Sequence, residues 1–192
     1  MPSSAPIDDV EAQINIYKDL DYTKEVIDGQ KWVGYIKAAE TVISLCNKKT
    51  KVADIGCGTG ELGMALSYAG FKSVDGYDII PDYIDISKQY YRKSEYCNII
   101  ETPLPEVYDV VVASGLFNHG CLSSDPLRNI SRSLDVDGLL VMTHPTTDYL
   151  KTHGWTNEKF FRFIDTSPSF LGRVADGKEF HYQISVLERI MI

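Results

Sequence analysis

Short apolar segments alternate with amphipathic segments along most of the chain. The apolar segments span 51–55, 73–78, 96–100, 108–114 and 138–144, and segments with a helical spacing of apolar residues connect them. Strands that alternate with helices of this length predict an α/β fold, in which right-handed crossovers wind a parallel sheet. The segment 110–113 is apolar at every position, as expected of a central strand that is covered on both faces.

The two ends of the chain depart from this alternation. Between Ile14 and about Cys46, apolar residues recur at steps of three and four, which predicts a helix with one buried face. The apolar residues of that face are Trp32, Ile36, Ala39, Val42, Ile43 and Cys46. A last helix is expected at 146–155, followed by strands at 159–167 and 179–190 that pair as a long antiparallel hairpin. These patterns predict a flexible arm over 1–15 and a single domain over 16–192, with a helical lead-in at 16–48 and the sheet core at 49–192.

Composition narrows the class of protein. The formal net charge of −8, from 19 basic and 27 acidic residues, argues against nucleic acid as a partner, because phosphate binding needs a concentrated basic face. The four cysteines, Cys46, Cys57, Cys97 and Cys121, are too far apart to suggest a zinc site or a disulfide framework. No secretory signal and no membrane span is predicted. We therefore expect a cytoplasmic or nuclear protein with no metal and no membrane partner.

A glycine-rich segment, GCGTGELG at 56–63, follows the first predicted strand at the edge of the sheet where ligands bind. Such a loop can hold the phosphates of a dinucleotide, hold a nucleoside that has no phosphate, or only form a tight turn. Gly58, Gly60 and Gly63 formally satisfy the GxGxxG pattern, but the pattern starts two residues beyond the strand end. Read from Gly56, the third dinucleotide glycine falls at Glu61. No Gly-Lys-Ser/Thr follows, which excludes a P-loop.

Two carboxylates favour the nucleoside. Asp54 lies just ahead of the loop, where a negative charge repels phosphate and suits an ammonium group. Asp78 closes the second strand, and its two oxygens can accept hydrogen bonds from both ribose hydroxyls. An adenosine with an amino-acid tail, S-adenosylmethionine, satisfies both. The structural alternatives are glycines that only permit a positive φ, Asp78 as a strand-end cap, and Asp54 as an N-cap acceptor.

Four segments together resemble a known motif series. VADIGCGTGELG, VDGYDII, YDVVVASGLF and SRSLDVDGLLVMTH are similar to the motifs of class I S-adenosylmethionine-dependent methyltransferases. Among these, the chain most resembles the small methyltransferase-like proteins named after the Williams–Beuren deletion region, over roughly residues 17–148. The resemblance implies a Rossmann-like, doubly wound sheet of seven strands in the order 3-2-1-4-5-7-6, mostly parallel with an antiparallel last strand.

The resemblance also implies a set of cofactor contacts. Gly56, Gly58 and Gly60 are expected to wrap the methionine part, with Cys57 contributing its backbone, while Asp78 binds the ribose. Ile79 is expected against adenine, with Glu101 or Thr102 at the adenine edge. Ser114 and Gly115 are expected beneath the sulfonium, and the aromatic lead-in residues Tyr17, Tyr22 and Trp32 are expected to form a lid.

Methyl transfer requires alignment and exclusion of water more than it requires an acid. A base is needed only where the acceptor must lose a proton, and the candidate bases are His119 and His144. We therefore expect a methyltransferase that converts S-adenosylmethionine to S-adenosylhomocysteine, acts on an unidentified small molecule, and is a monomer or homodimer. The alternatives are a protein methyltransferase, a nucleoside-binding protein without turnover, and an NAD(P)-linked oxidoreductase. The last lacks a Tyr-x-x-x-Lys pair, because YYRK at 90–93 has the wrong spacing.

Overall fold

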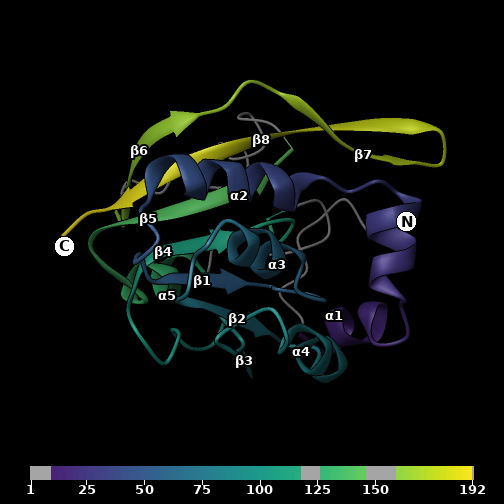
Figure 1. The fold of residues 1–192 in the computed structure, drawn as a ribbon, viewed down its shortest axis with the longest axis horizontal. Coiled ribbons are helices and arrows are strands. Elements are labelled where there is room, and N and C mark those ends of the chain that lie inside the picture. Colours follow the sequence, from purple (N-terminus) through teal and green to yellow (C-terminus); the bar gives the residue numbers. More distant parts are fainter. Residues whose placement is uncertain (1–9, 118–125, 146–158, 192) are drawn as a thin grey trace.

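A computed structural model describes residues 10–117, 126–145 and 159–191 of the chain. Within these ranges a single sheet of eight strands runs through the molecule in the order β3-β2-β1-β4-β5-β8-β6, with β7 paired to β8 (Figure 1). The strands are β1 Val52–Ile55, β2 Val74–Asp78, β3 Lys93–Tyr96, β4 Tyr108–Ala113, β5 Leu134–His144, β6 Phe161–Thr166, β7 Phe170–Ala175 and β8 Lys178–Arg189.

The strand directions agree with the predicted fold class. Strands β1 to β5 pair in parallel, whereas β8 is antiparallel to β5 and to β6. The last strand, β8, therefore lies between β5 and β6, as the predicted order requires, and the prediction of a Rossmann-like fold is confirmed. Strand β7 is an addition, because that segment was predicted to be a loop. Asp176 and Gly177 both have positive φ, 50° and 71°, and form the tight turn that lets β7 pair with β8.

The helices of the described residues are α1 Val10–Tyr17, the π-helix η1 Thr23–Gly29, α2 Gly34–Leu45, α3 Glu61–Tyr68, α4 Pro81–Ser87 and α5 Leu127–Arg132. The single lead-in helix predicted from Ile14 to Cys46 is therefore wrong, since three helices replace it. Two of its predicted buried residues, Ile36 and Ile43, are each 39% exposed. Helix α1 also begins inside the predicted flexible arm over 1–15. The helix predicted at 146–155 lies outside the described residues.

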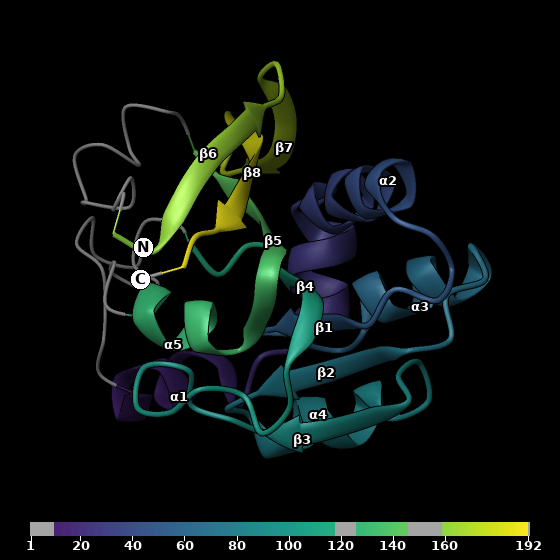
Figure 2. The same ribbon diagram turned by 90° about the vertical axis from the view of Figure 1, so that its left-hand side faces the viewer.

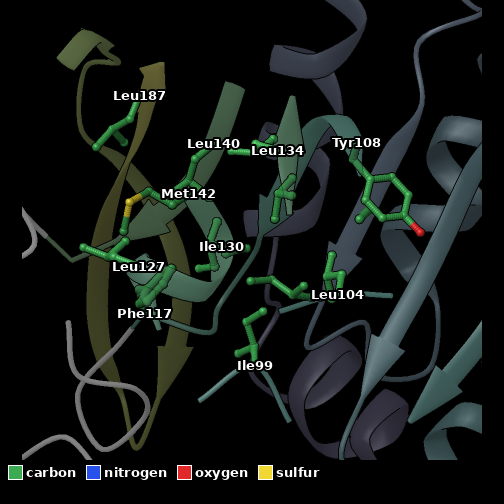
Figure 3. Packing of buried hydrophobic residues seen from close by; sticks show 14 of the residues in the cluster. Ile99, Leu104, Tyr108, Phe117, Leu127, Ile130, Leu134, Leu140, Met142 and Leu187 are labelled. Atoms are coloured by element: carbon green, nitrogen blue, oxygen red, sulfur yellow. The ribbon is translucent and has the colours of Figure 1, made fainter. Parts of the chain in front are cut away.

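The helices pack on both faces of the sheet, with α2 and α3 on one face and α5 on the other (Figure 2). Successive residues of β4 alternate between the two faces, as the pleat of a strand dictates. Val110 and Val112 pack with α2 and α3, whereas Val111 and Ala113 pack with α5. Figure 3 shows part of the cluster on the α5 face, in which Leu127 and Ile130 of α5 contact the strands. This core fixes the carboxyl ends of β1, β2 and β4 at one edge.

Candidate cofactor site

The glycine loop joins β1 to α3 at this edge of the sheet. Gly56, Gly58 and Gly60 have φ values of 67°, 52° and 104°, a left-handed conformation that glycine adopts without steric cost. The amides of Gly56 and Cys57 both donate to the Tyr77 carbonyl oxygen, at 2.8 and 3.1 Å. These bonds fasten the loop to the neighbouring strand β2, so that its backbone is held in place before any ligand binds.

Two adjoining cavities flank the loop. The main cavity lies between the loop, the end of β2, the segment after β3 and the N-terminal lead-in, and it is lined by Val10, Gln13, Tyr17, Tyr22, Ile55, Gly56, Gly58, Tyr77, Asp78, Ile79, Ile80, Tyr83, Cys97, Asn98, Ile99, Ile100, Ser114, Gly115 and Leu116. The smaller cavity, here called the acidic pocket, is lined by Tyr22, Ile27, Trp32, Tyr35, Asp54, Gly56, Cys57, Gly58, Glu61, Leu62 and Ser114. The two share four lining residues and so form one continuous site. No lysine, arginine or histidine is among these lining residues.

Asp78 ends β2 and organises the main cavity. Its Oδ2 accepts the Gly58 amide at 2.8 Å, and its Oδ1 accepts the amides of Ile79 and Ile80 at 2.7 and 3.0 Å. Burial raises the pKa of Asp78, and the three N–H groups oppose the rise. Because each carboxylate oxygen has two lone pairs, these bonds leave one acceptor position, on Oδ2. The open position can take one ribose hydroxyl, and the binding of both hydroxyls by Asp78 stays a prediction.

Asp54 lies in β1 and forms one wall of the acidic pocket. It is 2% exposed, and its Oδ2 accepts the hydroxyl of Tyr91 at 2.5 Å. Its pKa is raised to about 8. Burial is the largest cause of the rise, and the charges of Asp78 and Glu61 add to it, whereas the Tyr91 hydrogen bond opposes it. Within the described ranges no lysine, arginine or histidine forms an ion pair with Asp54. The pocket thus holds a buried carboxylate that a cationic ligand would stabilise.

The N-terminal lead-in covers the main cavity. The Tyr83 hydroxyl of α4 lies 2.8 Å from the Tyr17 carbonyl oxygen and 3.0 Å from that of Leu20, and shares its proton between them. The Tyr22 ring packs against the Tyr83 ring with centroids 5.8 Å apart. The π-helix that follows is a rare conformation that is frequent at functional sites. Its Thr23 hydroxyl lies 3.2 Å from the Thr59 hydroxyl of the glycine loop.

Most of the predicted cofactor residues come together here. Eight line the main cavity, namely Tyr17, Tyr22, Gly56, Gly58, Asp78, Ile79, Ser114 and Gly115, and Asp54 and Cys57 line the acidic pocket together with Trp32. Gly60 does not reach either cavity. A Cβ at Gly60 would lie 2.7 Å from the Tyr90 ring, so this glycine lets α3 approach the segment after α4.

Thr102 is exposed and lines neither cavity. The third strand ends at Tyr96, earlier than predicted, so residues 97–100 turn into the main cavity instead. Among them Asn98 is buried, and its Oδ1 accepts the Ile100 amide at 3.1 Å. Sequence reasoning missed Asn98, because a strand predicted at 96–100 places Asn98 inside the strand and the ligand-facing residue after it, at 101 or 102.

The structure describes only one of the two predicted bases. His119 lies outside the described residues. His144 is completely buried at the end of β5, where its Nε2 lies 2.7 Å from the Ser185 hydroxyl of β8. It lines neither cavity. Among the described residues it forms a polar contact between two strands of the sheet, and its role as a catalytic base stays a prediction.

Comparisons with known proteins define the class. A family model described as "Methyltransferase domain" matches residues 46–181, and the chain belongs to this family. Its fold is shared by a TehB-like SAM-dependent methyltransferase from Corynebacterium glutamicum, at 23% identity and a TM-score of 0.60 over 79% of this chain and 86% of that one. It is also shared by a putative RNA methyltransferase from Pyrococcus horikoshii, at 16% identity and a TM-score of 0.63 over 82% and 84%.

TehB from Haemophilus influenzae has the same fold, with 16% identity and a TM-score of 0.58 over 81% of this chain and 62% of that one. A search of the curated proteins finds no match. The chain is thus a methyltransferase of the class I fold. Within the described ranges, no helix has the length and apolar character to cross a bilayer.

Proposed function

We propose that this protein transfers a methyl group from S-adenosylmethionine to a small-molecule acceptor. The observation that carries the proposal is the pair of buried carboxylates on neighbouring strands, Asp54 and Asp78, on the two sides of a glycine loop. In a chain that belongs to a methyltransferase family, this arrangement suits a ligand with a sugar at one end and an ammonium group at the other.

The chemistry of the lining residues fits this cofactor. Adenosine fits the apolar part of the main cavity, with Ile79 and Ile99 beside the base and Asn98 able to bond its polar edge. A ribose hydroxyl can use the open acceptor position of Asp78, and the methionine ammonium can face Asp54. A dinucleotide fits poorly, because its pyrophosphate would meet two carboxylates and, among the described lining residues, no basic one.

Ser114 supports placement of the reacting end between the cavities. Its Oγ is buried and has no hydrogen-bond partner among the described residues, and the residue lines both cavities. A buried hydroxyl without a partner costs free energy, which a ligand or water at this junction would relieve. When bound, S-adenosylmethionine supplies an electrophilic methyl group on a positively charged sulfur. The chain supplies alignment and an apolar surrounding that excludes water.

The acceptor is proposed to be a small molecule because the chain has a net charge of −8 and no described residue that lines either cavity is basic, which suits neither RNA nor DNA. His119 stays the candidate base where the acceptor must lose a proton.

The experiment that tests the proposal incubates the pure protein with methyl-labelled S-adenosylmethionine and a protein-free metabolite extract. Label in a new small molecule, lost in an Asp78→Ala variant, is the expected result. Binding of S-adenosylhomocysteine without any transfer would favour a nucleoside-binding protein, and binding of NADH in its place would contradict the proposal.

A further inference from the structure

The segment 90–93, which lacks the spacing of an oxidoreductase pair, brings Tyr91 against the glycine loop from the connection between α4 and β3. Tyr91 is 7% exposed. Its hydroxyl donates to Asp54 Oδ2 at 2.5 Å and accepts the Gly63 amide at 3.1 Å. One side chain therefore links the acidic end of β1 to the first turn of α3.

Two glycines form a slot for the Tyr91 ring. A Cβ at Gly63 would lie 2.4 Å from Cε1 of the ring, and a Cβ at Gly76 of β2 would lie 2.8 Å from Cδ2. Atoms cannot approach so closely, so any larger residue at either position displaces the ring. The last glycine of the loop segment, Gly63, is thereby explained by Tyr91 rather than by contact with a ligand. The ring is a fixed part of the site.

We propose that Tyr91 is a positioning residue for the ammonium end of the cofactor, because it orients the Asp54 carboxylate and stabilises the charged form that an ammonium group binds. This inference rests on the proposed function and extends it to a residue that lines neither cavity. Tyr91 takes one acceptor position of Oδ2 and holds the carboxylate in one orientation. The Gly63 amide, one of the unpaired donors at the start of α3, bonds the phenol oxygen and strengthens its donation to Asp54.

The surroundings of Asp54 make this donation important. Among the described residues, the titratable groups around it are Tyr22 of the lead-in, Tyr35 of α2, Cys57 of the loop, Glu61 of α3, Asp78 of β2 and Tyr91. None is a base that could carry a positive charge. Burial raises the pKa of Asp54 to about 8, and the Tyr91 hydrogen bond is the one contribution that lowers it. Without the hydroxyl, the charged carboxylate forms only at higher pH.

The test measures the affinity for S-adenosylhomocysteine by calorimetry between pH 6.5 and 8.5 in the wild type and in Tyr91→Phe. Wild-type affinity is expected to rise with pH, because Asp54 ionises near pH 8. In Tyr91→Phe the rise in affinity moves to higher pH. For each pH unit by which it moves, the affinity at pH 7 is about tenfold weaker than that of the wild type. The deficit shrinks toward pH 8.5. In a protein that already carries Asp54→Asn, adding Tyr91→Phe is expected to leave the pH dependence of the affinity unchanged.

Tyr108→Phe is the control, since Tyr108 is also buried, lines neither cavity and donates to Asp75 at 2.7 Å. It is expected to lower stability and leave the pH profile unchanged. An affinity loss in Tyr91→Phe that is equal at every pH, or no loss, overturns the inference. Failure of the wild type to bind overturns the proposed function instead.

Thermal unfolding first establishes that Tyr91→Phe is folded. If it is not, 3-fluorotyrosine at position 91 keeps the shape of the ring and donates a stronger hydrogen bond. The rise in affinity is then expected at lower pH than in the wild type. A rise at the same pH as in the wild type overturns the inference.

Discussion

Replacing Asp78 by asparagine removes one charge and one acceptor oxygen where β2 meets the glycine loop. The native carboxylate accepts three backbone amides, from Gly58, Ile79 and Ile80. The asparagine oxygen can keep the last two bonds as neutral ones, but its NH₂ then faces the Gly58 amide, and two donors meet. A lost charge-assisted bond costs about 1.5–3 kcal/mol. With the weakening of the other two bonds, the free energy of unfolding is expected to fall by about 3 kcal/mol.

For a chain of this length, such a loss lowers the melting temperature by about 6–12 °C. The same substitution removes the acceptor expected to bind ribose, so affinity for S-adenosylhomocysteine falls at least about tenfold. Calorimetric titration and thermal unfolding measure the two effects. Asp82→Asn is the control, because Asp82 is exposed in the first turn of α4 and should change neither quantity. Unchanged stability and affinity in Asp78→Asn would refute the role given to this carboxylate.

Three further substitutions probe other parts of the site. Tyr83→Phe removes the hydroxyl that bonds the lead-in carbonyls and should cost about 1 kcal/mol of ligand binding, or roughly fivefold in affinity by calorimetry. Gly63→Ala places a Cβ 2.4 Å from the Tyr91 ring and should cost about 1–3 kcal/mol of stability by urea unfolding; a neutral result would mean that the ring is not confined. Asp54→Asn should gain thermal stability over the ligand-free wild type as pH rises. The folded-state pKa of Asp54 is raised to about 8, so the wild type loses stability between about pH 4 and 8; a constant difference would contradict this pKa.

The sequence predicted the central strands well, because β1, β2 and β4 are short, mostly buried apolar runs and β5 ends in one at 138–144; the exposed residues 135–137 of β5 were missed. Edge elements were harder. Strand β3, KSEY, has one buried residue in four, and its charged sequence resembles that of a loop. The apolar residues after it line the cavity rather than the sheet, which led to the choice of Thr102 over Asn98. Strand β7 was missed although Asp176-Gly177 is a strong hairpin signal.

Within the site, the residues that a local motif specifies were predictable, and those that arrive from elsewhere in the fold were not. Asp54, Asp78 and the loop glycines are neighbours of strand ends, so their place at the sheet edge follows from the topology alone. Tyr83 and Tyr91 act through hydroxyls that reach backbone and carboxylate groups 28 or more residues away in sequence. No periodicity encodes such contacts. The position of His144 at a strand end likewise does not reveal that it is completely buried beside Ser185 of β8.

A crystal structure of the protein grown with S-adenosylhomocysteine tests the central claim most directly. We predict adenosine in the main cavity, a ribose hydroxyl on Asp78 Oδ2, and the amino group facing Asp54. Ligand bound elsewhere, or its amino group turned away from Asp54 toward solvent, would contradict the account.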